Sequence, residues 1–251
     1  MCAQYEGEWI MDCSKRKSNW LPTTSPFMTK ELLAKFLREY GDKYPEDVRV
    51  MLQEKLYKNV GSYMNLVEFF QVYSYTGIFG KNDDIYYGYY KKLSEVFDID
   101  CNILDVASGY VPAFGTIVSG KQLELPNAKG KVTVCDPAII IENVKHSNMT
   151  INKDKFSKDN DLSKYDLVTG IMPCEVTRDL IKAACEQNKD FYVGLCFCEP
   201  ADYVPTDDKM FFEENIDYAR DICSEYGRTL EETQLDPDYY VSLPVIYSKK
   251  R

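Results

Sequence analysis

Carboxylates stand at the ends of two apolar runs, where each could hold part of a ligand. Asp105 lies near the end of the run NILDVA, and Asp136 ends the run KVTVCD, 27 positions after Gly109. A carboxylate beside the turn that follows a strand can pair with an ammonium or another cation. A carboxylate at the end of the second strand can accept hydrogen bonds from both hydroxyls of a ribose. Together, the two positions predict a site for a nucleoside that carries a positive charge.

The turn after Asp105 has fewer glycines than a dinucleotide-binding turn. In NILDVASGYVPAFG (residues 102–115), Gly109 stands alone inside the turn, with Ala107 before it and Val111 after it. A pyrophosphate needs close approach to the backbone along the whole turn, whereas a phosphate-free ligand needs it mainly at one point. Asp105 would also repel a pyrophosphate. These residues favour S-adenosylmethionine, which carries an ammonium and a sulfonium, and they disfavour an NAD-dependent oxidoreductase.

Structural roles are possible for the same residues. Gly109 and Asp105 could belong to an ordinary strand-to-helix turn, because glycine is common in such turns. Asp136 could cap a helix over PAIIIENV, with Pro137 at its first position. A capping role for Asp136 is compatible with ribose binding.

From residue 102 onward, short apolar runs alternate with helical stretches. The runs are NILDVA, KVTVCD, MTINKD, YDLVTGIM and DFYVGLCF. Runs that are apolar on both faces predict an α/β fold with a doubly wound, mostly parallel sheet. A helix is expected over FFEENIDYARDICSEYG. The two runs that follow, RTLEETQL and YYVSLPVIYSKK, flank the turn-prone LDPD, so the C-terminal strand is expected to run antiparallel.

Residues 1–97 carry helical signals and are expected to form a helical N-terminal region or cap beside a ligand-binding domain at residues 98–251. The segments with helical periodicity are TKELLAKFLREYG, PEDVRVMLQEKLYKNV, SYMNLVEFFQVYSY and DDIYYGYYKKLSEVF. Aromatic rings in this region could line a lid over a ligand, or they could form the core and rim of a helical bundle, which is the commoner role. These rings belong to Tyr73, Tyr75, Tyr86, Tyr87, Tyr89 and Tyr90.

The segment DVASGYVPA, followed by VTVCDP, resembles motifs I and II of the class I S-adenosylmethionine-dependent methyltransferases, over roughly residues 100–250. The resemblance implies a Rossmann-like methyltransferase fold, S-adenosylmethionine as cofactor and methyl transfer as the reaction. In this family an acidic residue after the third strand lies near the adenine, and INKDKF would supply it as Asp154. The cofactor-binding residues that the resemblance implies are Asp105, Ala107, Ser108, Gly109, Asp136, Pro137, Asp154, Met172 and Pro173.

The segment YDLVTGIMPCEVT places Pro173, Cys174 and Glu175 where, in such enzymes, the acceptor meets the methyl group. With FYVGLCFCEP, it also resembles a methyltransferase subgroup that has a His-Pro-Cys or His-Ala-Cys turn, although Met172 stands where that subgroup often has His. Glu175 is the expected proton acceptor, with Cys174 as a second catalytic candidate. A structural thiol is the commoner role for such a cysteine. A non-catalytic nucleoside-binding or interaction module on the same scaffold is the alternative from another functional class.

The net charge of -10 opposes binding to a phosphate backbone, so a small-molecule or protein acceptor is expected, and a nucleic acid is not. A second resemblance, to aminoglycoside-resistance methyltransferases that act on ribosomal RNA, therefore ranks lower. No apolar run approaches the ~18 residues of a membrane span. The nine cysteines do not form the framework of a small secreted domain, so a cytoplasmic location is expected.

The sequence does not favour a metal or a hydrolase. Its single histidine, His146, lies in a polar segment, which makes a Ser-His-Asp relay improbable. Cys196 and Cys198, with the distant Cys174, do not have the spacing of a zinc site. No metal is expected.

Overall fold

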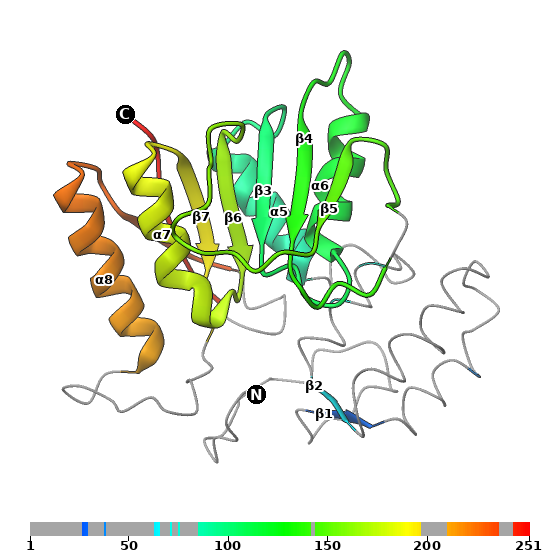
Figure 1. The fold of residues 1–251 in the computed structure, drawn as a ribbon, viewed down its shortest axis with the longest axis horizontal. Helices are drawn as coiled ribbons and strands as arrows, with labels where there is room; N and C mark the ends of the chain where they lie inside the picture. Colours follow the sequence, from blue (N-terminus) through cyan, green and yellow to red (C-terminus); the bar gives the residue numbers. More distant parts are fainter. Residues whose placement is uncertain are drawn as a thin grey trace.

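The computed structural model describes residues 27–29, 38, 63–65, 71, 75, 85–141, 144–196, 210–235 and 243–251. A seven-stranded sheet forms the centre of this part of the chain (Figure 1). Its strands are β3 (Asn102–Val106), β4 (Lys131–Cys135), β5 (Met149–Asn152), β6 (Leu167–Ile171), β7 (Asp190–Gly194), β8 (Glu231–Gln234) and β9 (Pro244–Ser248). They lie in the order β5-β4-β3-β6-β7-β9-β8.

The strand directions confirm the predicted fold class. The strands β5, β4, β3, β6 and β7 are parallel to one another, whereas β9 runs antiparallel to both β7 and β8. All five apolar runs that were predicted as strands form strands, and every residue of β6 is buried. This arrangement is the Rossmann-like methyltransferase fold, a doubly wound sheet in which one strand near the C-terminus is reversed.

Helices cover both faces of the sheet (Figure 1). On one face lie α5 (Ile85–Val96) and α6 (Ala113–Leu123), and on the other lie α7 (Thr177–Glu186) and α8 (Phe211–Glu225). The chain builds the sheet outward from β3 through β4 to β5 and then returns to place β6 on the other side of β3. The carboxyl ends of β3 and β6 therefore meet at a topological switch point, the usual place for a ligand in an open α/β sheet.

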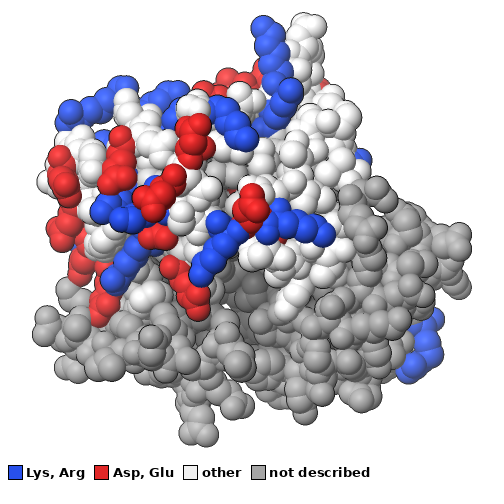
Figure 2. Space-filling view, viewed as in Figure 1, with Lys and Arg blue, Asp and Glu red and all other residues white. Residues whose placement is uncertain are grey.

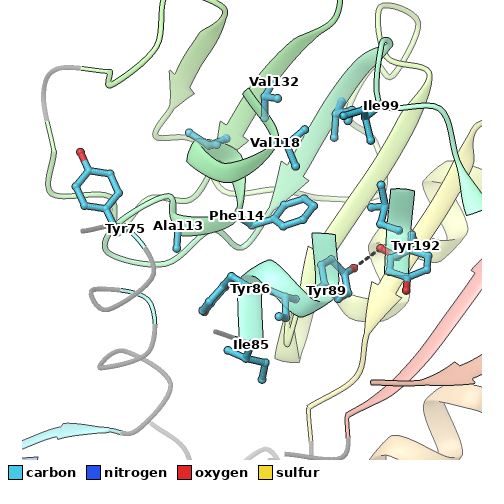
Figure 3. Close-up of a cluster of buried hydrophobic side chains, with 14 of the residues drawn as sticks. Tyr75, Ile85, Tyr86, Tyr89, Ile99, Ala113, Phe114, Val118, Val132 and Tyr192 are labelled. Carbon is cyan, nitrogen blue, oxygen red and sulfur yellow. Dashed lines mark hydrogen bonds between the residues drawn. The ribbon is translucent and has the colours of Figure 1, made fainter. Parts of the chain in front are cut away.

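The helix α5 packs onto the sheet through Tyr89, which is fully buried. Its hydroxyl donates to the carbonyl oxygen of Tyr192 at 2.7 Å (Figure 3). The same hydroxyl lies 2.9 Å from Thr169 Oγ1. Its ring packs against Phe114 and Tyr192, with centroid distances of 5.1 and 4.9 Å. The predicted helix over DDIYYGYYKKLSEVF is confirmed, and Tyr86 and Tyr89 belong to the core that α5 shares with the sheet.

One helix prediction in the N-terminal region is wrong at its start. The structure has a short antiparallel pair there, β1 (Phe27–Thr29) with β2 (Tyr63–Asn65), so SYMNLVEFFQVYSY begins as a strand. Local periodicity could not reveal this pairing, because the partner strand lies far away in the sequence. Arg38, Gln71 and Tyr75 are helical. The other residues of these predicted helices, and Tyr73, lie outside the described residues.

None of the helices in the described ranges combines the length and the apolar composition that a bilayer crossing requires.

Candidate functional site

The predicted site residues lie where the carboxyl ends of β3, β4 and β6 meet. The loop that contains Gly109 follows β3, Asp136 follows β4, and Met172 begins the segment after β6. Parallel pairing of β3 with both β4 and β6 brings these three segments to one edge of the sheet. The structure therefore brings together residues that the sequence separates widely.

The loop after β3 is held in a strained conformation by the end of β4. Ala107 and Gly109 have positive φ values of 58° and 72°. The N–H of Ala107 donates to the carbonyl oxygen of Cys135 at 2.9 Å, and the N–H of Ser108 donates to the same oxygen at 3.5 Å. Glycine tolerates a positive φ, whereas alanine does so at a cost in free energy. The loop thus keeps a tight turn at Ala107, where the sequence offers no glycine.

Asp136 holds the loop directly through a backbone amide. Its Oδ2 accepts a hydrogen bond from the N–H of Gly109 at 2.9 Å, and its Oδ1 accepts one from Ala138 at 2.7 Å. Amides at this position of a dinucleotide-binding loop face the phosphates. Here a carboxylate takes the Gly109 amide, which opposes the binding of a pyrophosphate.

The predicted helix over PAIIIENV is wrong. Pro137 and Ala138 form a turn, and residues 139–141 are irregular. The bond from Ala138 to the Asp136 side chain closes a turn of the kind that Asp favours, and it replaces the expected helix cap. The N–H of Ile140 also donates to the carbonyl oxygen of Tyr110 at 3.0 Å, which ties this segment to the loop after β3.

Asp105 is almost completely buried, with 1% of its surface exposed. Along β3 it alternates with Leu104 and Val106, so its side chain lies on the face of the sheet that α5 and α6 cover. The Ser108 hydroxyl donates to its Oδ2 at 3.0 Å. No hydrogen-bond partner for its Oδ1 exists among the residues that the structure describes.

Burial raises the pKa of the Asp105 carboxyl to about 7. The negative charge of Asp136 adds to this effect, whereas the hydroxyl of Ser108 and the nearby backbone N–H of Gly115 lower the pKa. A buried carboxyl with one orphaned oxygen can gain a hydrogen bond and a counter-charge from a cationic ligand. The structure is thus compatible with the role that the sequence predicts for Asp105.

Two residues at the loop were not predicted from the sequence. Gly115, in the first turn of α6, lies so close to β4 that a Cβ there would overlap Val134 Cγ1, so it serves the close packing of helix on strand. The position of Gly115 at the end of NILDVASGYVPAFG could have indicated this packing role from the sequence. Gln71 is buried, and its side-chain amide lies against Gly109. No pattern around Gln71 indicates this contact, because it depends on tertiary packing.

The segment after β6 forms a second strained turn beside the first. Met172 and Cys174 have positive φ values of 54° and 46°, and the N–H of Met172 donates to the carbonyl oxygen of Gly194 at 2.7 Å. Pro173 is buried, and the short 3-10 helix η5 (Cys174–Val176) leads from it into α7. Glu175 is exposed. Strained backbone conformations cluster at functional sites, and these two residues lie at the switch point.

Asp154 lies further out along the same edge. It follows the end of β5 by two residues, and its side chain is exposed. Its N–H donates to Asn152 Oδ1 at 3.0 Å, and its carbonyl oxygen accepts a hydrogen bond from the thiol of Cys135 at 3.4 Å. A contact between Asp154 and an adenine remains a prediction.

Among the described residues, no group of three or more His, Cys, Asp or Glu side chains is arranged to hold a metal ion. Cys198, one of the cysteines considered above, lies outside the described residues.

No protein-family model and no curated protein matches the chain. Solved structures resemble it in fold. One is a SAM-dependent methyltransferase from Aquifex aeolicus, 13% identical, with a TM-score of 0.40 over 63% of this chain and 87% of that one. The antibiotic-resistance methyltransferase Kmr is 10% identical, with a TM-score of 0.43 over 65% of this chain and 93% of Kmr. A mutant of MtNAS is 13% identical, with a TM-score of 0.43 over 88% of this chain and 81% of MtNAS. These likenesses concern the fold alone.

Proposed function

We propose that this chain binds S-adenosylmethionine at the carboxyl edge of its sheet and transfers the methyl group to an acceptor. One observation carries the proposal: the carboxylates of Asp105 and Asp136 flank the loop at Gly109, and the Gly109 amide donates to Asp136. Such a loop favours a ligand with a positive charge and without phosphate, because two carboxylates repel a pyrophosphate.

The residues present fit this ligand. The orphaned Oδ1 of Asp105 can accept from an ammonium group. Each carboxylate oxygen has about two acceptor sites, so Asp136 keeps one on each oxygen after binding Gly109 and Ala138. Those remaining sites can receive the two hydroxyls of a ribose. Asp154 is assigned to the adenine, and Met172 and Pro173 to the cofactor pocket, by the resemblance to the methyltransferase family.

When bound, S-adenosylmethionine supplies an electrophilic methyl group, and methyl transfer leaves neutral S-adenosylhomocysteine. The chain's part in the reaction is to orient the acceptor and to exclude water. Both effects increase the rate of an in-line displacement. Pro173 is buried and can shape the floor of the acceptor site, and the exposed Glu175 can take the proton that an acceptor loses. We assign Cys174 a supporting role, because its thiol donates to the carbonyl oxygen of Met172.

We propose a small molecule or a protein as the acceptor. The net charge of -10 supports this choice. Lys and Arg are also interspersed with Asp and Glu on the face in Figure 2, so the residues described there form no continuous basic surface. A cytoplasmic location stays a prediction.

The proposal is tested with methyl-labelled S-adenosylmethionine and three separate acceptor pools: small molecules, proteins and RNA from a cell extract. We expect label in one of the first two pools and release of S-adenosylhomocysteine. Glu175→Gln is expected to lower the rate by about 100-fold, because the variant cannot accept the proton. The matched control is Glu225→Gln, an exposed position at the end of α8. Binding of the cofactor without transfer to any pool would favour the non-catalytic module, and binding of NAD in its place would contradict the proposal.

A further inference from the structure

Gln71 belongs to the N-terminal region, yet its side chain reaches the loop after β3. It is 7% exposed, and a Cβ on Gly109 would overlap its amide group. Gln71 and Tyr75 are both helical and both buried. Tyr75 belongs to the buried core cluster on the α6 side of the sheet (Figure 3). Lys145 Nζ donates to the carbonyl oxygen of Tyr75 at 3.3 Å. Gln71 and Tyr75 therefore both contact the domain that carries the site.

Two buried oxygen atoms at this loop lack hydrogen bonds. Within the described part of the chain, neither Gln71 Oε1 nor Asp105 Oδ1 has a hydrogen-bond partner. The Asp105 carboxylate adjoins the loop through Ser108, and the Gln71 amide adjoins it at Gly109. Buried polar atoms without partners are uncommon and are often completed by a ligand or by water. A ligand group that satisfies both acceptor oxygens must donate at least two hydrogen bonds.

An ammonium group meets this requirement, since it has three N–H donors and no acceptor. The amide oxygen of Gln71 has a partial negative charge, and the carboxylate of Asp105 has a full negative charge when it is ionised. Both therefore attract the positive charge of an ammonium group. A phosphate or a carboxylate would be repelled by the same two oxygens.

We propose that Gln71 Oε1 accepts a hydrogen bond from the α-ammonium group of the bound ligand, together with Asp105, so that the N-terminal region completes the amino-acid end of the site. This inference rests on the proposed function and adds a binding residue to it. Gln71 then acts as a specificity residue. It increases the affinity for ligands that have a free α-amino group and does not change the affinity for nucleosides that lack one.

Calorimetric titration with two probes tests the inference. S-adenosylhomocysteine carries the α-amino group, whereas 5′-methylthioadenosine has the same nucleoside without the amino acid. Gln71→Met keeps the length of the side chain and removes the acceptor, and Gln71→Glu keeps an acceptor oxygen. Arg38→Met, at an exposed helical position of the same region, is the control.

We expect Gln71→Met to weaken the binding of S-adenosylhomocysteine by about 10-fold or more, because a buried hydrogen bond to a charged group is lost. Its affinity for 5′-methylthioadenosine should stay unchanged. Gln71→Glu should retain affinity for S-adenosylhomocysteine, and Arg38→Met should alter neither affinity. The melting curve of the ligand-free Gln71→Met protein checks that this variant folds.

Several outcomes would overturn the inference and leave the proposed function standing. One is an unchanged affinity of Gln71→Met for S-adenosylhomocysteine, and another is an equal loss for both probes, which would indicate a packing role. Tighter binding by Gln71→Met would show that Gln71 obstructs the loop. If the wild-type protein binds neither probe, the proposed function itself fails and this inference fails with it.

Discussion

Asp105 shows, at the scale of a single residue, how a binding group can lower the stability of the ligand-free protein. Burial raises its pKa to about 7, whereas an unfolded chain releases this proton near pH ~3.9. Between these values the folded state binds more protons than the unfolded state, so the free energy of unfolding falls as the pH rises. Groups with such perturbed pKa values are concentrated at functional sites.

The substitution Asp105→Asn should therefore stabilise the ligand-free protein at about pH 8, by up to about 4 kcal/mol, because no charge is buried there. The gain should shrink toward about pH 5, where the wild-type carboxyl is protonated. Urea denaturation at the two pH values measures the difference, with Asp159→Asn, at an exposed position, as the control. A variant that is less stable than the wild type at the higher pH would contradict this account of Asp105.

Ligand binding should have the opposite dependence on pH. An ammonium group pairs with the ionised form of Asp105, so affinity for S-adenosylhomocysteine should rise by about 10-fold between about pH 6 and about pH 8. The groups that act on this carboxyl are the Ser108 hydroxyl, the Gly115 amide and the negative charge of Asp136. Calorimetry should find the rise in the wild type and a flat profile in Asp105→Asn. A fall in wild-type affinity over this range would show that the ligand does not pair with Asp105.

The adjacency of Asp105, Gly109 and Asp136 could be predicted because carboxyl ends of parallel strands meet at one edge. The bond from the Gly109 amide to Asp136 could not, since it depends on one rotamer and on the path of a loop. The contact of Gln71 with Gly109 could not be predicted from the sequence either, because it arises only when the N-terminal region packs against the loop.

At the scale of elements, β3, β6 and β7 were the most predictable strands, because each is a short apolar run that is buried along almost its whole length. The sequence of residues 137–144 is compatible with a helix. In the structure, the turn at Asp136 and the hydrogen bond from Ile140 to Tyr110 hold residues 137–141 in a non-helical conformation. The strand β2 was missed because its only hydrogen-bonding partner among the described residues is β1, which local patterns do not reveal.

The packing of α5 against the sheet through Tyr89 gives a prediction at this scale. Tyr89→Phe removes the hydroxyl that donates to Tyr192 and lies near Thr169, and it leaves those buried polar groups without this partner. We expect a loss of about 1–3 kcal/mol in the free energy of unfolding, measured by urea denaturation. Tyr90→Phe, on the half-buried position next to it, is the control and should change stability little. Equal effects of the two substitutions would contradict the role of the Tyr89 hydroxyl.

At the scale of the whole molecule, charge argues against a polyanionic acceptor. With a net charge of -10, the protein should not be retained on heparin at physiological ionic strength. Chromatography on a heparin column with a salt gradient measures this directly. Retention that needs high salt for elution would point to a nucleic-acid partner and against a small-molecule or protein acceptor.

The central claim is that the edge formed by β3, β4 and β6 binds a cationic, phosphate-free nucleoside. The direct measurement is calorimetric titration of the full chain with S-adenosylmethionine and, separately, with NAD. We expect micromolar binding of S-adenosylmethionine, weaker binding in Asp136→Ala, and no binding of NAD. Binding of NAD, or no heat with S-adenosylmethionine in a protein shown to be folded, would contradict it.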